Sequence, residues 1–66
     1  MTEVETLKAE IKKLSAKAIQ AKMDLHDLSE ELPVNWRSVL DVAKRTYDAY
    51  EILEKKRADL KQLETA

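Results

Sequence analysis

The residues with the most chemical potential stand a few positions before the only proline of the chain. His26 is the single histidine, and Glu30 follows four residues later, so on a helix both side chains project from one face. Asp27 borders that face. An imidazole nitrogen combined with carboxylate oxygens suits divalent ions such as Ni, Zn, Fe or Co. The pattern therefore predicts a transition-metal site with His26, Glu30 and Asp27 as its candidate ligands.

Two features favour a plainer interpretation of this histidine. Metal-binding helical bundles often carry a glutamate three residues before the histidine, and here that position is Met23. One histidine per chain is also too few for a tight site unless two-fold symmetry brings a second His26 near it. The alternative is a half-buried interface histidine hydrogen-bonded to Glu30 or Asp27, with Met23 as a gap-filling apolar residue.

An unbroken apolar pattern defines the element that carries these residues. Its members are spaced alternately three and four apart, which is the seam of one amphipathic helix. They are Val4, Leu7, Ile11, Leu14, Ala18, Ala21, Leu25, Leu28 and Leu32. Thr2 and Glu5 stand at capping-box spacing, and Pro33 forces a turn after Leu32. We expect a helix over about residues 3–31, a turn over 32–35 and a second helix over about 36–64.

The second half of the chain repeats the stripe with more polar members. They are Val39, Val42, Thr46, Ala49, Leu53, Lys56, Leu60 and Leu63. Asn35 or Ser38 is placed to cap this helix. Folding at Pro33 pairs residues whose numbers sum to about 67. Val4 then faces Leu63, the methylene stem of Lys56 covers Ile11, and the two tyrosines of the second helix, Tyr47 and Tyr50, lean across Ala18 and Ala21.

The predicted fold class is all-α, an antiparallel two-helix hairpin in one domain over residues 1–66. So short a chain rarely stabilises itself alone, and apolar residues also extend beyond the seam. These are Ile19 and Met23, next to His26, and on the second helix Leu40, Ala43, Tyr47 and Tyr50, with Ile52 as a further candidate. We expect a homodimer that forms a four-helix bundle, with Trp36 plugging its end. The alternative is that the extra residues only thicken the hairpin core.

Composition excludes several classes of protein. Glycine and cysteine are absent, the formal net charge is −1, and no apolar run approaches the length of a membrane span. The polar start shows no signal peptide, so we expect a cytoplasmic protein. There is no phosphate-binding loop, cysteine nucleophile or Ser/His/Asp set with a pocket to hold it, so we expect no enzymatic activity. The chain has a modest basic patch, but acidic residues interrupt it and no aromatic residues are interleaved with it. This pattern disfavours nucleic-acid binding. The members of the patch are Lys12, Lys13, Lys55, Lys56 and Arg57.

Three short segments carry a resemblance to a known family. They are Asp24-Leu25-His26-Asp27-Leu28, Leu32-Pro33 with Trp36, and Thr46-Tyr47 with Ala49-Tyr50. With them the chain resembles the Rop-like family of short helical-hairpin proteins encoded in nitrogen-fixation gene clusters. The resemblance implies a dimeric antiparallel four-helix bundle, an association with nitrogenase maturation or its regulation, and metal binding.

The expectation is therefore a small accessory protein of nitrogen fixation. It would bind a second copy of itself and, near its turn, a transition metal or a nitrogenase-maturation protein. Two alternatives stay open: an RNA-binding regulator that uses the basic patch, and a structural adaptor without a ligand.

Overall fold

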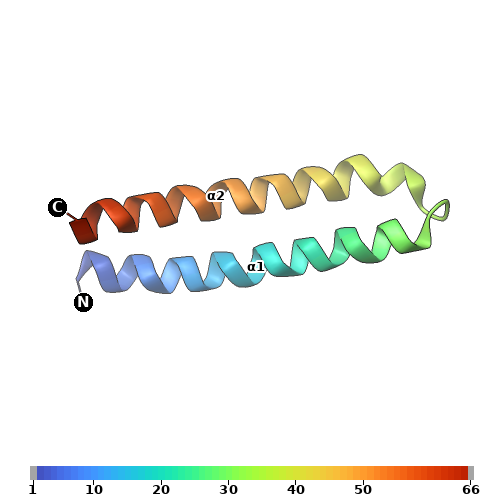
Figure 1. The fold of residues 1–66 in the computed structure, drawn as a ribbon. Helices are drawn as coiled ribbons and strands as arrows, with labels where there is room; N and C mark the ends of the chain where they lie inside the picture. Colours follow the sequence, from blue (N-terminus) through green and yellow to red (C-terminus); the bar gives the residue numbers. More distant parts are fainter. Residues whose placement is uncertain (1, 66) are drawn as a thin grey trace.

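A computed structural model describes residues 2–65 as two long helices joined by a tight turn. Helix α1 covers Glu3–Glu31, a short 3-10 helix η1 covers Trp36–Ser38, and α2 covers Val39–Thr65. Figure 1 shows the two helices running antiparallel, with the turn at one end and both termini at the other. The hairpin is a rod with extents of 49 × 16 × 13 Å. No helix within residues 2–65 is long and apolar enough to cross a membrane.

Helix α1 begins where the capping residues predict. The Thr2 side chain accepts a hydrogen bond from the Glu5 amide at 3.2 Å, which satisfies one of the unpaired donors of the first turn. Glu3 and Glu5 place negative charge at the positive end of the helix dipole. The helix ends at Glu31, two residues before Pro33.

The turn differs from the prediction at the start of the second helix. Asn35 has φ 59°, in the left-handed region that asparagine tolerates better than most residues. Its side chain makes no capping hydrogen bond, and α2 begins directly after Ser38, the other residue predicted as a cap. The Ser38 amide instead donates to the Asn35 carbonyl at 2.9 Å, within the 3-10 turn. The α-helix therefore begins at Val39, three residues later than expected.

The core is a narrow line of apolar contacts between the helices. Its most buried residues are Ala18 and Leu28 from α1 with Val42 and Leu53 from α2, all of them seam positions. The Thr46 hydroxyl lies 3.2 Å from the Ala21 carbonyl oxygen across the interface and 2.9 Å from the Val42 carbonyl oxygen on its own helix. Residues 21 and 46 have the predicted sum, which confirms the register of the hairpin.

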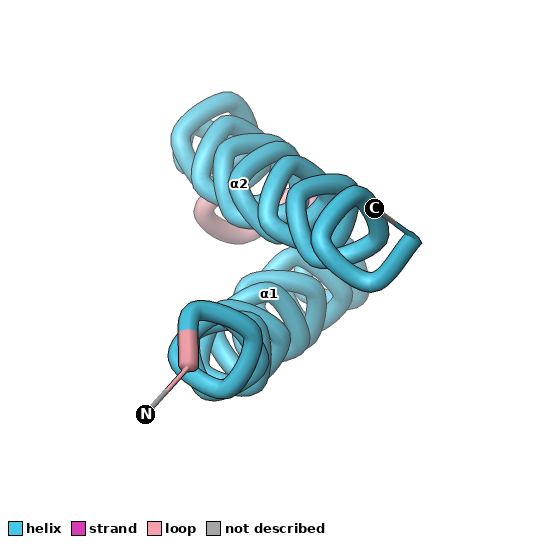
Figure 2. The backbone as a smooth tube through the Cα atoms, turned by 90° about the vertical axis from the view of Figure 1, so that its left-hand side faces the viewer, coloured by secondary structure: helices cyan, strands magenta, loops and turns pink. Residues whose placement is uncertain are grey.

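Three side chains that were predicted to pack between the helices lie outside this core. Leu63 and Leu32 are exposed although the pattern assigns them to the seam, and Tyr47 is 67 % exposed rather than leaning over the small residues. Figure 2, which looks along the rod from its open end, shows that α1 and α2 cross instead of staying parallel. The crossing separates the open ends of the two helices, where Leu63 is exposed. Tyr50, by contrast, is half-buried as expected.

Candidate functional site at the turn

The predicted metal ligands lie together on the last turns of α1. The His26 Nε2 atom is 3.3 Å from the Glu30 carboxylate, and its Nδ1 atom is 3.6 Å from Asp27. The His26 side chain is 66 % exposed in the single hairpin, and its burial at an interface between copies stays a prediction. The four-residue spacing on a helix accounts for the approach of Glu30.

The two carboxylates lie against different nitrogens of the imidazole. A cation bound at Nε2 would have Glu30 beside it, while Asp27 lies on the Nδ1 side at 3.6 Å, where a closer approach would let its carboxylate accept a hydrogen bond from Nδ1–H and orient the ring. Within residues 2–65, no group of three His, Cys, Asp or Glu side chains is arranged to hold a metal ion. The arrangement thus offers a two-group site whose further ligands would come from water or another molecule.

Apolar side chains surround this region without a partner in the hairpin. Ile19 and Met23 are exposed on α1, on the turns that precede His26. On α2, Leu40 is 84 % exposed and Tyr47 is also open to solvent. Exposed apolar groups in such numbers are typical of an interaction surface on a small protein.

Ile52 does not belong to this surface. It lines a groove together with Lys13 and Lys17 of α1, and these lysines lie on a different side of that helix from Ile19. The prediction that Ile52 widens the same apolar stripe is therefore wrong, because helical periodicity carries it to the opposite flank of α2.

The basic patch is partly neutralised by neighbouring acids. The Lys56 ammonium is 3.3 Å from Glu10 on the other helix, and the Arg57 guanidinium is 2.9 Å from Glu54. Paired cations attract phosphate less strongly than isolated ones. The charge distribution is therefore that of a solvated, mixed-charge face.

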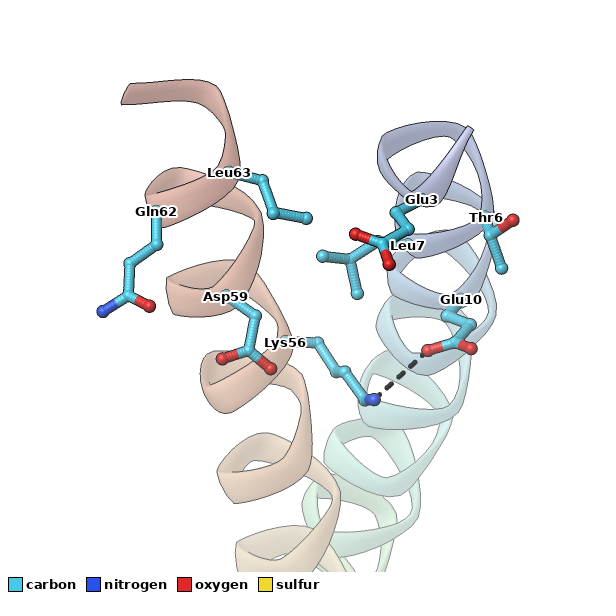
Figure 3. Close-up of a pocket in the computed structure, with 8 residues that line it drawn as sticks. All are labelled: Glu3, Thr6, Leu7, Glu10, Lys56, Asp59, Gln62 and Leu63. Carbon is cyan, nitrogen blue, oxygen red and sulfur yellow. Dashed lines mark ion pairs between the residues drawn. The ribbon is translucent and has the colours of Figure 1, made fainter. Parts of the chain in front are cut away.

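Two features were not anticipated from the sequence. The Arg37 guanidinium lies over the Trp36 ring, 5.4 Å from its centroid, and the indole is 59 % exposed in the single hairpin. At the opposite end, the separated helices leave an open cleft (Figure 3). Adjacency of tryptophan and arginine could have signalled the first feature, whereas the cleft depends on a helix crossing that heptad spacing does not encode.

The arrangement defines a class of protein: a two-helix antiparallel rod with a tight turn and a continuous apolar seam. A family model described as Rop-like matches residues 2–65. The chain therefore belongs to the Rop-like family, as the resemblance predicted.

Curated relatives and a solved structure agree with this membership. A UPF0437 protein of Azorhizobium caulinodans is 62% identical over 64 residues, which span 97% of this chain and 93% of the relative. A relative from Frankia alni, described as a UPF0437 protein in the nifX-nifW intergenic region, is 60% identical over 40 residues, 61% of this chain and 49% of the relative. An NMR structure from the Northeast Structural Genomics Consortium is 48% identical with a TM-score of 0.90, and the match covers 100% of this chain and 94% of that one.

Proposed function

We propose that this protein is a cytoplasmic, non-catalytic accessory protein of nitrogen fixation. It works as a homodimeric four-helix bundle and binds a protein partner or a transition metal near its turn. The relative in the nifX-nifW intergenic region supports the link to nitrogen fixation, since this chain shares its family and 60% of the aligned residues.

The observation that carries the proposal is the half-covered seam. Most seam residues in both helices are neither buried nor fully exposed, because a hairpin covers each helix from only one direction. They are Val4, Leu7, Ile11, Leu14, Ala21, Leu25, Val39, Thr46, Ala49, Lys56 and Leu60. A second hairpin laid against the open side of the seam would complete a core with a helix at each corner.

In the proposed dimer, the two hairpins lie antiparallel, with their turns at opposite ends of the rod. The seam is best covered in the middle of the rod, at Ala18 and Leu53, and it is exposed at both ends, at Leu32 beside the turn and at Leu63 near the termini. Opposite orientation lays the turn of one copy beside the separated ends of the other. Closed two-fold symmetry then repeats this contact at both ends.

Equilibrium sedimentation of the full chain tests the dimer. We expect a single species of twice the chain mass at micromolar concentration, and a monomer under those conditions would contradict the proposal. Leu7→Lys, which places a charge in the half-covered seam, should shift the distribution toward monomer. Lys8→Glu, a change on the neighbouring exposed position, is the matched control and should leave the dimer intact.

The partner-binding surface consists of the exposed apolar side chains near the turn. Leu40 and Tyr47 on α2 remain open in the hairpin, as does Met23 on α1. A nitrogenase-maturation protein is the partner class that fits the gene setting of the Frankia relative. Affinity purification from a nitrogen-fixing culture should recover such a protein with the native chain, and Leu40→Asp should abolish its recovery. If both chains recover it equally, Leu40 is not part of the surface.

Metal binding is the second candidate, favoured by the 3.3 Å approach of Glu30 to His26 Nε2. His26 stands nine residues from the middle of α1, so two copies with opposite turns hold their histidines roughly 27 Å apart along the rod. Each chain would then carry its own site. The symmetric pair of histidines considered from the sequence requires both turns at one end.

Neighbouring glutamates allow a matched test of the metal site. Untagged protein purified with Ni, Zn, Fe or Co should retain metal, and His26→Ala and Glu30→Ala should reduce the metal content. Glu31→Ala changes the same residue type one position away, where the structure gives no contact with His26, and should not. Equal metal content in all variants would remove His26 and Glu30 from the proposal.

A further inference from the structure

The cleft at the open end of the rod has a distinct chemical character. Its volume is about 810 Å³, and Leu7 and Leu63 point toward one another across it (Figure 3). Glu3, Glu10 and Asp59 line it with a single ammonium, that of Lys56. Three carboxylates against one ammonium give the cleft an acidic balance above an apolar floor.

The charges in the cleft are only partly matched within the hairpin. Lys56 pairs with Glu10 at 3.3 Å, as the dashed line in Figure 3 indicates. Among the ion pairs of residues 2–65, none involves Glu3 or Asp59. The cleft therefore favours an occupant that has an apolar body and a cationic group.

The turn at the other end of the rod is apolar and cationic, which complements the acidic cleft. Trp36 presents a largely exposed indole with the Arg37 guanidinium over its ring, and Val34 beside it is exposed too. Arg37 makes none of the ion pairs of residues 2–65. A tryptophan and an arginine are the residue types that most often dominate the energy of a protein interface.

We infer that the cleft of one copy is filled by the turn of a second copy, with Trp36 against Leu7 and Leu63 and Arg37 facing Glu3 and Asp59. This inference rests on the homodimer proposed above and specifies its contacts. Turns at opposite ends bring each turn level with the partner's termini, because the turn and the termini occupy the two ends of one rod (Figure 1). Two-fold symmetry gives the dimer two such contacts, each a buried aromatic anchor with a charge match at its rim.

The only tryptophan of the chain reports directly on this contact. The full-length chain is diluted through the dimer–monomer transition, with mass followed by sedimentation and Trp36 followed by fluorescence and acrylamide quenching. We expect the emission to shift to shorter wavelength and quenching to fall as the dimer forms. A dimer in which Trp36 stays as quenchable as in the monomer overturns the inference and leaves the homodimer standing. A chain that never dimerises overturns both.

Charge reversal tests which surface covers the indole. Arg37→Glu should weaken dimerisation on the order of tenfold, and adding Asp59→Arg should restore it to within roughly threefold. Lys44→Glu makes the same charge change at an exposed position that pairs only with Asp48 of its own helix, and should change the dimerisation constant less than twofold. If Asp59→Arg fails to rescue Arg37→Glu, the acidic cleft is not the surface that receives the turn.

Discussion

Two leucines on α2 have opposite environments and give a direct test of the core. Leu53 is 2 % exposed, whereas Leu40 is 84 % exposed. Leu53→Ala removes buried apolar volume and leaves a cavity, so we expect it to lower the free energy of unfolding by about 2–5 kcal/mol. Leu40→Ala should change it by no more than about 0.5 kcal/mol. Urea titration followed by circular dichroism measures both, and equal losses would contradict the assignment of Leu53 to the core.

The left-handed Asn35 gives a second test at the scale of a residue. A residue with a Cβ atom and no compensating side-chain bond costs about 1–2 kcal/mol at positive φ, while glycine adopts this region freely. Asn35→Ala should therefore lower the free energy of unfolding by about 1 kcal/mol, and Asn35→Gly should leave it nearly unchanged. The same urea titration distinguishes them. Glycine as the more damaging substitution would contradict the backbone geometry of the turn.

At the scale of the element, the start of α1 and the end of α2 differ in their side-chain hydrogen bonds. Thr2 caps α1 through the Glu5 amide, whereas the Thr65 hydroxyl near the end of α2 bonds only to carbonyls of its own last turn. We expect Thr2→Ala to cost about 0.5–1 kcal/mol of stability and to reduce helical signal at the N-terminus. Thr65→Ala is the control and should have little effect. Amide hydrogen exchange at residues 3–6 that is unchanged by Thr2→Ala would exclude the cap as the cause.

The two helices and their register could be predicted because they follow from the sequence period alone. Heptad spacing fixes which face of each helix is apolar, and a turn at Pro33 leaves one antiparallel pairing, which the contact of Thr46 with Ala21 confirms. The 3-10 segment and the late start at Val39 depend on the dihedral angles of Asn35, which the residue type permits but does not dictate. A side chain such as Tyr47 was misplaced because helix crossing decides whether a flanking position covers the partner.

For the candidate site, the spacing of the side chains could be predicted from the sequence, but their burial could not. Proximity of His26 and Glu30 follows from a four-residue spacing on one helix, and the structure has it at 3.3 Å. Whether the histidine is covered depends on what packs against α1 from outside the hairpin, which no local pattern encodes. The acidic cleft lay beyond sequence reasoning because its residues come from both open ends and are brought together by the divergence of the helices.

At the scale of the whole molecule, the hairpin exposes more surface than its mass warrants. Its accessible area is 5434 Å², against roughly 4,300 Å² for a compact monomer of 7.6 kDa. The excess, roughly 1,100 Å² per chain by this scaling, is of the order that each partner buries in a sizeable stable interface. A rod two helices wide therefore has the surface of half an assembly.

If a second copy covers this excess surface, the stability of the fold depends on chain concentration. If folding is coupled to dimerisation, a hundredfold rise in chain concentration adds about 2.7 kcal/mol to the stability of the dimer over unfolded chains. For an assembly of this size, that corresponds to a rise in Tm of roughly 10 °C. Differential scanning calorimetry over two decades of concentration measures the shift. Because a hairpin that is stable alone unfolds at a Tm independent of concentration, a constant Tm would show that the half-covered seam suffices and that the second hairpin is not required for folding.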